Sequence, residues 1–156
     1  MFEKDIDALL ADHPFFKDMN VDSRGLIAGC GKNVRFETGA LIARTGDPAN
    51  QFFAIRHGRV AIELHSSSRG PLILQTLDEG EILGWSWLFP PYRWTFDARA
   101  LDDVRAVAFD GECLRGKCDR DPAMGYDFMK RFAGAFMQRL QAARVQLLDL
   151  YGPHNQ

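Results

Sequence analysis

The sequence predicts a mainly β domain: an eight-stranded antiparallel β-roll, or jelly roll, with helices before it and a long dimerisation helix after it. Three observations predict this fold class. Apolar residues at helical spacing occupy the first part of the chain, a period of two runs from Asn33 to Phe109, and a long stretch without proline follows Pro122. Short strands at regular spacing, each bounded by turn residues, are typical of a sandwich or roll.

Residues 1–31 are expected to form the N-terminal helices. Ile6, Leu9 and Leu10 share one apolar helical face, which ends before Pro14. A second short helix is expected over Val21–Ala28, because glycines at 29 and 31 terminate the pattern.

Residues 33–109 are expected to form the β-roll. Apolar and polar residues alternate in short runs, and Gly, Asp, Asn or Ser separate these runs. The segment from Gly80 to Pro91 is expected to connect the strands that flank it. Seven or eight short strands are expected, and seven of them cover residues 34–37, 41–42, 52–55, 60–64, 72–77, 95–101 and 104–109.

Residues 111–151 are expected to form the C-terminal helices. Glu112–Cys118 suits a short helix, and Asp121-Pro122 is a favourable start for a long one, which at 1.5 Å per residue would extend about 45 Å. Residues 1–156 are therefore read as a single domain.

The composition favours a soluble cytoplasmic protein. The formal net charge is −2, which gives no general attraction to DNA or to an anionic membrane. No signal peptide opens the chain and no apolar run is long enough to span a bilayer. Three cysteines (Cys30, Cys113 and Cys118) are too few for a disulfide framework, so reduced thiols are expected.

An ordered set of glycine motifs carries a family resemblance. The motifs are Gly39-x-Leu41-Ile42, Gly46-Asp47-Pro48, Phe53-x-Ile55-x-x-Gly58-x-Val60, Leu77-x-x-Gly80-Glu81-x-x-Gly84 and Ala98-x-Ala100. With their spacing, they resemble the cyclic nucleotide-binding domain of bacterial catabolite-activator and fumarate-nitrate type regulators. The resemblance covers about Phe2 to Tyr151.

The resemblance implies a phosphate-binding cassette between two strands. In the family a short helix and an arginine hold the cyclic phosphate, while a glutamate accepts from the ribose. Here Trp85 stands at the glutamate position and Trp94 at the arginine position, although a one-residue shift would place Arg93 there. The candidate ligand-binding residues are Gly84, Trp85, Ser86, Arg93, Trp94 and Thr95.

These departures predict a degenerate cassette. A buried phosphate without its cation loses about 2–5 kcal/mol, and Ala143 and Arg144 replace the polar purine contacts of the long helix. We expect the cassette tryptophans to fill part of the pocket, although they could instead stack a planar ligand. The alternative is a genuine binder of cyclic AMP or cyclic GMP, with Arg93 as phosphate anchor and Ser86 and Thr95 in support.

The long helix carries a heptad seam that predicts a homodimer. Phe128 and Phe132 lie off this seam and are expected to pack on the chain's own roll, which leaves the seam free for a second copy. The predicted interface residues are Met129, Ala133, Phe136, Leu140, Ala143, Leu147 and Leu150.

No catalytic or metal-binding constellation is evident, so the chain is not expected to be an enzyme and no cofactor is predicted. A cupin-type metal enzyme is a distant alternative, because that fold is a similar roll but needs a His-x-His motif that the sequence lacks. Glu81, Asp97 and Arg99 are expected to form a surface ion pair.

The family's winged helix-turn-helix does not follow the long helix, so no DNA binding by the chain itself is expected. The sequence thus predicts a stand-alone sensor or regulatory domain that acts on a separate protein partner.

Overall fold

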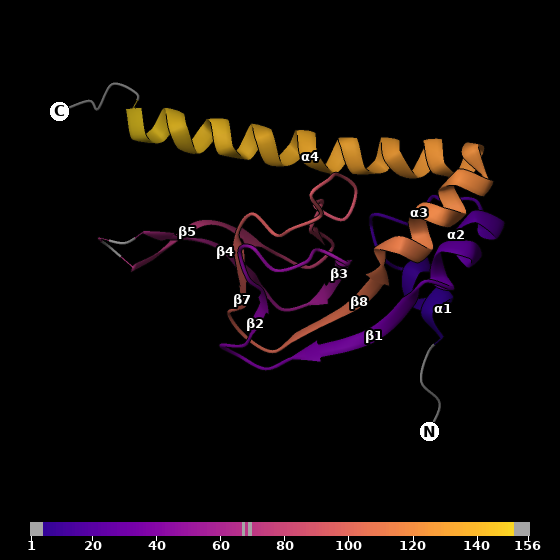
Figure 1. Ribbon diagram of the computed structural model, residues 1–156, viewed down its shortest axis with the longest axis horizontal. Coiled ribbons are helices and arrows are strands. Elements are labelled where there is room, and N and C mark those ends of the chain that lie inside the picture. Colours follow the sequence, from indigo (N-terminus) through magenta and orange to yellow (C-terminus); the bar gives the residue numbers. More distant parts are fainter. Residues whose placement is uncertain (1–4, 67, 69, 152–156) are drawn as a thin grey trace.

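The computed structural model describes residues 5–66, 68 and 70–151. Helices α1 (Ile6–Ala11) and α2 (Val21–Ala28) precede the strands, and α3 (Gly111–Arg120) and α4 (Pro122–Tyr151) follow them (Figure 1). Each helix begins where a short polar side chain accepts a backbone N–H of the first turn. These capping residues are Asp5, Asn20, Asp110 and Asp121.

In the described residues, eight strands form two four-stranded antiparallel sheets. The strands are β1 (Gly31–Phe36), β2 (Leu41–Ala43), β3 (Gln51–His57), β4 (Val60–Ser66), β5 (Gly70–Leu77), β6 (Ile82–Leu83), β7 (Asp97–Ala100) and β8 (Val104–Asp110). One sheet has the order β1-β8-β3-β6 and the other β2-β7-β4-β5. The fold class predicted from the sequence is therefore confirmed.

Strands β3 and β8 are apolar on both faces, and this divides the core in two. Phe52 and Phe109 face the helices, where they join an aromatic cluster with residues of α1, α2, α3 and α4. Their neighbours Phe53 and Ala108 face the opposite way, into the interior of the roll. Successive side chains of a strand point to opposite faces, so one sheet serves both clusters.

Helix α4 lies along the molecule above the sheets (Figure 1). Its first half carries Phe128 and Phe132, which are buried in the aromatic cluster, as the heptad pattern predicts. Its second half, from Met137 onward, extends above β4 and β5 (Figure 1). This half exposes most of its apolar side chains. The N-terminal part of α4 therefore anchors the helix to the domain.

The predicted elements differ from the observed ones at few points. Strand β6 falls in the segment that was expected only to connect strands, because two residues are too short for any alternation. Strand β1 begins at Gly31, inside the glycine pattern that was expected only to end α2. The predicted helix over Val21–Ala28 is confirmed with the same bounds.

The prediction of reduced cysteines is wrong for two of the three. Cys30 and Cys113 form a disulfide that ties the start of β1 to the first turn of α3, while Cys118 is free. The two residues are 83 positions apart in sequence, so only the folded chain brings them together. Of the helices in the described part of the chain, none has both the length and the apolar character needed to cross a bilayer.

Candidate functional site

The segment that corresponds to the cassette runs from β6 to β7 and begins at Gly84. This glycine has a φ of +105°, in the left-handed region, and a Cβ there would lie 2.8 Å from Cη2 of Trp94. Both facts require glycine at this position. The Trp94 ring therefore lies directly against the backbone at the start of the cassette.

Trp85, Trp94 and Phe96 pack the cassette segment against neighbouring parts of the molecule. Trp94 is 6% exposed and packs against Phe53 and Phe96, with ring centroids 6.5 Å and 5.7 Å away. Trp85 is half-buried and contacts Phe96 at 5.2 Å and Phe136 of α4 at 5.6 Å. Trp85 thus links the cassette to the long helix through ring contacts.

Trp87 points instead into the aromatic cluster beneath the helices. It is fully buried and stacks on Phe52 with centroids 4.9 Å apart. Its indole Nε1 has no hydrogen-bond partner in the described part of the chain. Its carbonyl accepts from Arg115 of α3, whose guanidinium also lies 4.7 Å from the centre of the Tyr92 ring. The cassette is therefore fixed from two sides.

The polar candidates of the cassette are divided between interior and surface. Ser86 is buried, whereas Arg93 and Thr95 are exposed. The Arg93 guanidinium donates to the carbonyl of Gly46 at 2.9 Å. Residues 84–96, all described, contain turns and a single bridge but no helix, so the short helix implied by the resemblance is not present. Arg93 and Trp94, neighbours in sequence, thus occupy opposite environments.

The seven predicted interface residues of α4 do not share one environment. Met129 and Phe136 are partly buried against the chain's own aromatic cluster. Ala133, Leu140, Leu147 and Leu150 are exposed, and Ala143 is half-exposed. The part of the seam that is free for a partner therefore lies mainly in the second half of the helix.

The ion pair expected among Glu81, Asp97 and Arg99 is wrong in its partners. Arg99 pairs with the buried Glu63 of β4 at 3.4 Å, and Asp97 accepts from the Thr45 backbone N–H at 2.8 Å, which lowers the pKa of its carboxyl. Among the described residues, no three His, Cys, Asp or Glu side chains are arranged to hold a metal ion.

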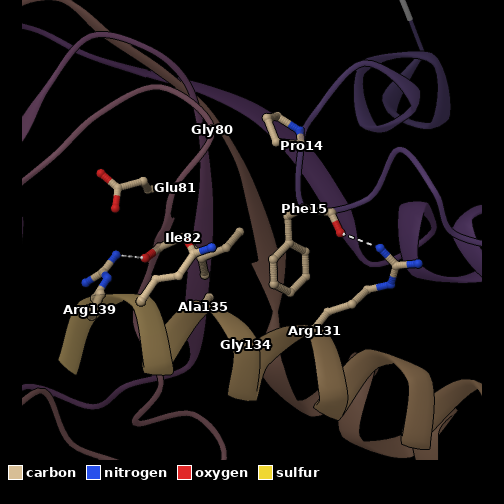
Figure 2. Close-up of a pocket in the computed structure, with 10 residues that line it drawn as sticks. Pro14, Phe15, Gly80, Glu81, Ile82, Arg131, Gly134, Ala135 and Arg139 are labelled. Carbon is tan, nitrogen blue, oxygen red and sulfur yellow. Dashed lines mark hydrogen bonds between the residues drawn. The ribbon is translucent and has the colours of Figure 1, made fainter. Parts of the chain in front are cut away.

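A cavity that the sequence did not reveal lies against α4, away from the cassette. It is lined by Pro14 and Phe15 after α1, by Gly80–Ile82, and by Arg131, Gly134, Ala135, Gln138 and Arg139 of α4 (Figure 2). No local pattern could reveal it, because three distant segments contribute its walls.

The roll and the cassette match the model of a known protein family. Residues 33–121, more than half of the chain, match the model of the cyclic nucleotide-binding domain. No curated protein sequence gives a match.

Solved structures share the fold. A putative cyclic nucleotide-binding protein from Geobacter metallireducens is 28% identical, with 88% of this chain and 99% of that chain covered and a TM-score of 0.75. A cyclic nucleotide-binding domain from Methylobacillus flagellatus is 13% identical, with 96% and 84% covered and a TM-score of 0.79. The N-terminal domain of a transcriptional regulator from Streptomyces coelicolor is 19% identical, with 94% and 99% covered and a TM-score of 0.67.

Proposed function

This chain belongs to the cyclic nucleotide-binding domain family, and we propose that it is a regulatory member whose cassette is filled by its own aromatic side chains. It binds classical cyclic nucleotides weakly, dimerises through α4 and regulates a separate protein partner in the cytoplasm. It has no catalytic activity of its own in this proposal.

The burial of Trp94 is the observation that carries this proposal. The resemblance gives this position to the arginine that holds the phosphate, yet the side chain here packs between Phe53 and Phe96. An indole that buries about 150–250 Å² contributes roughly 4–6 kcal/mol at about 25 cal/mol per Å². A nucleotide that displaced Trp94 would have to offset that loss without gaining a cation in exchange.

A second candidate function keeps nucleotide binding and uses Arg93. The favourable observation is that this guanidinium is exposed and, among the described residues, donates one hydrogen bond, to the Gly46 carbonyl at 2.9 Å. Releasing such a bond costs about 1 kcal/mol, so Arg93 could reorient toward a phosphate. The rim of the cassette would then hold the ligand, with Thr95 beside it.

The exposed second half of α4 supports the proposed dimerisation. Leu140, Leu147 and Leu150 are each more than half exposed, and they recur at the spacing of a two-helix coiled coil. A second copy would cover these leucines. Because the Trp85 ring contacts Phe136 of α4, binding of the second copy would be coupled to the cassette.

Calorimetry with cyclic AMP and cyclic GMP tests the proposal. The wild-type chain should bind neither more tightly than about 10 μM, because the glutamate and the buried arginine are both replaced. Tryptophan emission should change little on addition of either nucleotide.

Sub-micromolar binding by the wild type would contradict the filled-cassette proposal. Arg93→Ala then decides the second candidate: a loss of about 100-fold identifies Arg93 as the anchor, a difference near 2.7 kcal/mol. An unchanged affinity would reject that candidate too. The matched control is Arg35→Ala, an exposed arginine on β1 that pairs with Asp103.

A further inference from the structure

The cavity beside α4 is bounded by three segments that the cassette does not include. Its volume is about 330 Å³. Figure 2 shows the Phe15 ring and the Ile82 segment above the helix, with Arg131 at one end and Arg139 at the other. Pro14, Phe15, Ile82 and Ala135 supply apolar wall, and the charged groups stand at the ends. The space therefore combines an apolar middle with ionic ends.

Arg139 is a largely buried cation at one end of the cavity. Its guanidinium donates to the carbonyl of Ile82. Within the described part of the chain, no carboxylate lies within 4.0 Å of it, and Glu81 acts on it only at longer range. Burial lowers the pKa of Arg139, because the charged form loses hydration. A guanidinium has five N–H donors, and among the described residues Arg139 uses one of them, on the Ile82 carbonyl, in a site where an unpaired charge is costly.

Arg131, at the other end, is already paired. Its Nε lies 3.1 Å from Oδ2 of Asp127, and its Nη1 donates to the Phe15 carbonyl at 3.0 Å. These bonds hold the Phe15 loop against the helix and form the far wall. The excess positive charge of the cavity is therefore concentrated at Arg139.

Gly134 keeps the space between the two arginines open. A Cβ at this position would meet no atom within 4 Å, so neither close packing nor a positive φ requires glycine. Glycine inside a helix costs about 1 kcal/mol relative to alanine. The helix thus bears this cost at the one glycine of α4 that lines the cavity.

We propose that this cavity is a binding site for a small organic carboxylate with an apolar body, with the carboxylate on Arg139 and the body against Phe15 over Gly134. The planar fork of arginine matches a carboxylate through two parallel hydrogen bonds. Glu81 lines the same end, and its like-charge repulsion is larger for a dianion such as hydrogen phosphate than for a monocarboxylate. The site is separate from the cassette, and the proposal does not depend on nucleotide binding.

Benzoate is the probe for the test, with benzamide as its neutral analogue and inorganic phosphate as the competing anion. Each is titrated into the isotope-labelled chain while backbone amide shifts are followed. Benzoate should bind with a dissociation constant of about 1 mM or tighter, as expected for a ligand of this size. The largest shifts should fall at residues 14–15, 80–82 and 131–139. Benzamide and phosphate should bind at least 10-fold more weakly.

Two variants locate the site. Gly134→Leu should fill the cavity and weaken benzoate at least 10-fold, and Arg139→Gln should do the same by removing the charge. Gly25→Leu is the matched control, because Gly25 is an exposed helical glycine of α2 that also has no atom within 4 Å of its Cβ position. Its benzoate affinity should equal that of the wild type. If Arg139→Gln does not fold, Gly134→Leu alone carries the test.

Several results would overturn the proposal. One is the absence of benzoate binding up to about 10 mM. Equal binding of benzamide would reject recognition of the charge, and equal binding of phosphate would reject the preference for a carboxylate. Undiminished benzoate binding by Gly134→Leu would place the ligand elsewhere on the molecule.

Discussion

The two halves of α4 are similarly rich in apolar residues but differ in what covers them. In the first half Met124, Phe128 and Phe132 are at most 3% exposed. The rings of Phe128 and Phe132 contact Phe15 in the loop after α1, Phe52 of β3 and Trp87 of the cassette. In the second half Leu140 is 52% exposed and Leu148 is 69% exposed. The apolar content of a helix therefore does not show whether its apolar residues are buried in their own domain or exposed for contact with another chain. The position of the aromatic residues distinguishes the two.

The largest expected effect is at the packed half. Phe132→Ala should lower the free energy of unfolding by about 3–5 kcal/mol, because it removes a ring that contacts Phe15, Phe52 and Phe128. Leu148→Ala, in the exposed half, should change it by about 0.5 kcal/mol or less. Urea denaturation measures both. Similar losses for the two variants would remove the distinction between the halves.

The disulfide should have the next largest effect, because it fixes α3, which leads into the packed half. Cys113→Ser should lower the free energy of unfolding by about 2–4 kcal/mol, the usual range for a crosslink that closes a long loop. Thiol titration of the denatured, unreduced wild type should find one free thiol, that of Cys118. Three free thiols in protein purified without reductant would contradict this prediction.

The exposed half should respond in assembly rather than in folding. Leu147→Asp should raise the dimer dissociation constant by about 100-fold, since a charge would then lie at a core position of the seam. Val145→Asp is the matched control, because Val145 is 55% exposed but lies on the opposite side of the helix from the seam. Light scattering distinguishes a 17.6 kDa monomer from a dimer of twice that mass. A monomeric wild type at tens of micromolar would refute the predicted dimer.

The smallest effect concerns His13, which links the Phe15 loop, a neighbour of the packed half, to β3. The Phe15 N–H donates to Nδ1 at 3.2 Å, so Nε2 carries the proton and donates to the Ile55 carbonyl at 3.0 Å. Burial lowers the pKa of this imidazole below 6.5, and the nearby Arg56 charge acts in the same direction. Between the folded pKa and 6.5 the unfolded chain binds more protons, so the free energy of unfolding falls as the pH drops through this window.

His13→Gln should flatten this pH dependence, which urea midpoints measured between about pH 5 and 7 would record. His65→Gln is the control, because the His65 side chain is 68% exposed. An unchanged slope in His13→Gln would mean that other groups cause the acid sensitivity.

Local sequence patterns predicted most of the fold. The predictions that failed concern contacts between residues far apart in the sequence. The bounds of α2 follow from Asn20 and Gly29, which lie within or beside the helix. By contrast, the disulfide joins residues 83 positions apart, and Arg99 pairs with Glu63 on a neighbouring strand. The cavity at Arg139 needs three segments at once. Within the cassette, the sequence left open whether Arg93 or Trp94 takes the arginine position, and the structure shows the Trp94 ring buried and Arg93 exposed.

The register of β1 against β8 has a consequence for how the chain folds. Gly31 pairs with Phe109 and Phe36 pairs with Val104. The first strand in the chain, β1, therefore pairs with the last strand, β8. Such non-local pairing gives a high contact order, and rolls of this kind reach the native state in milliseconds to seconds rather than microseconds. During synthesis, the emerging strands β3 to β7 must therefore persist with one sheet incomplete until β8 leaves the ribosome. During that interval β5, with its exposed leucines Leu72 and Leu74, is the strand most exposed to incorrect pairing with other chains.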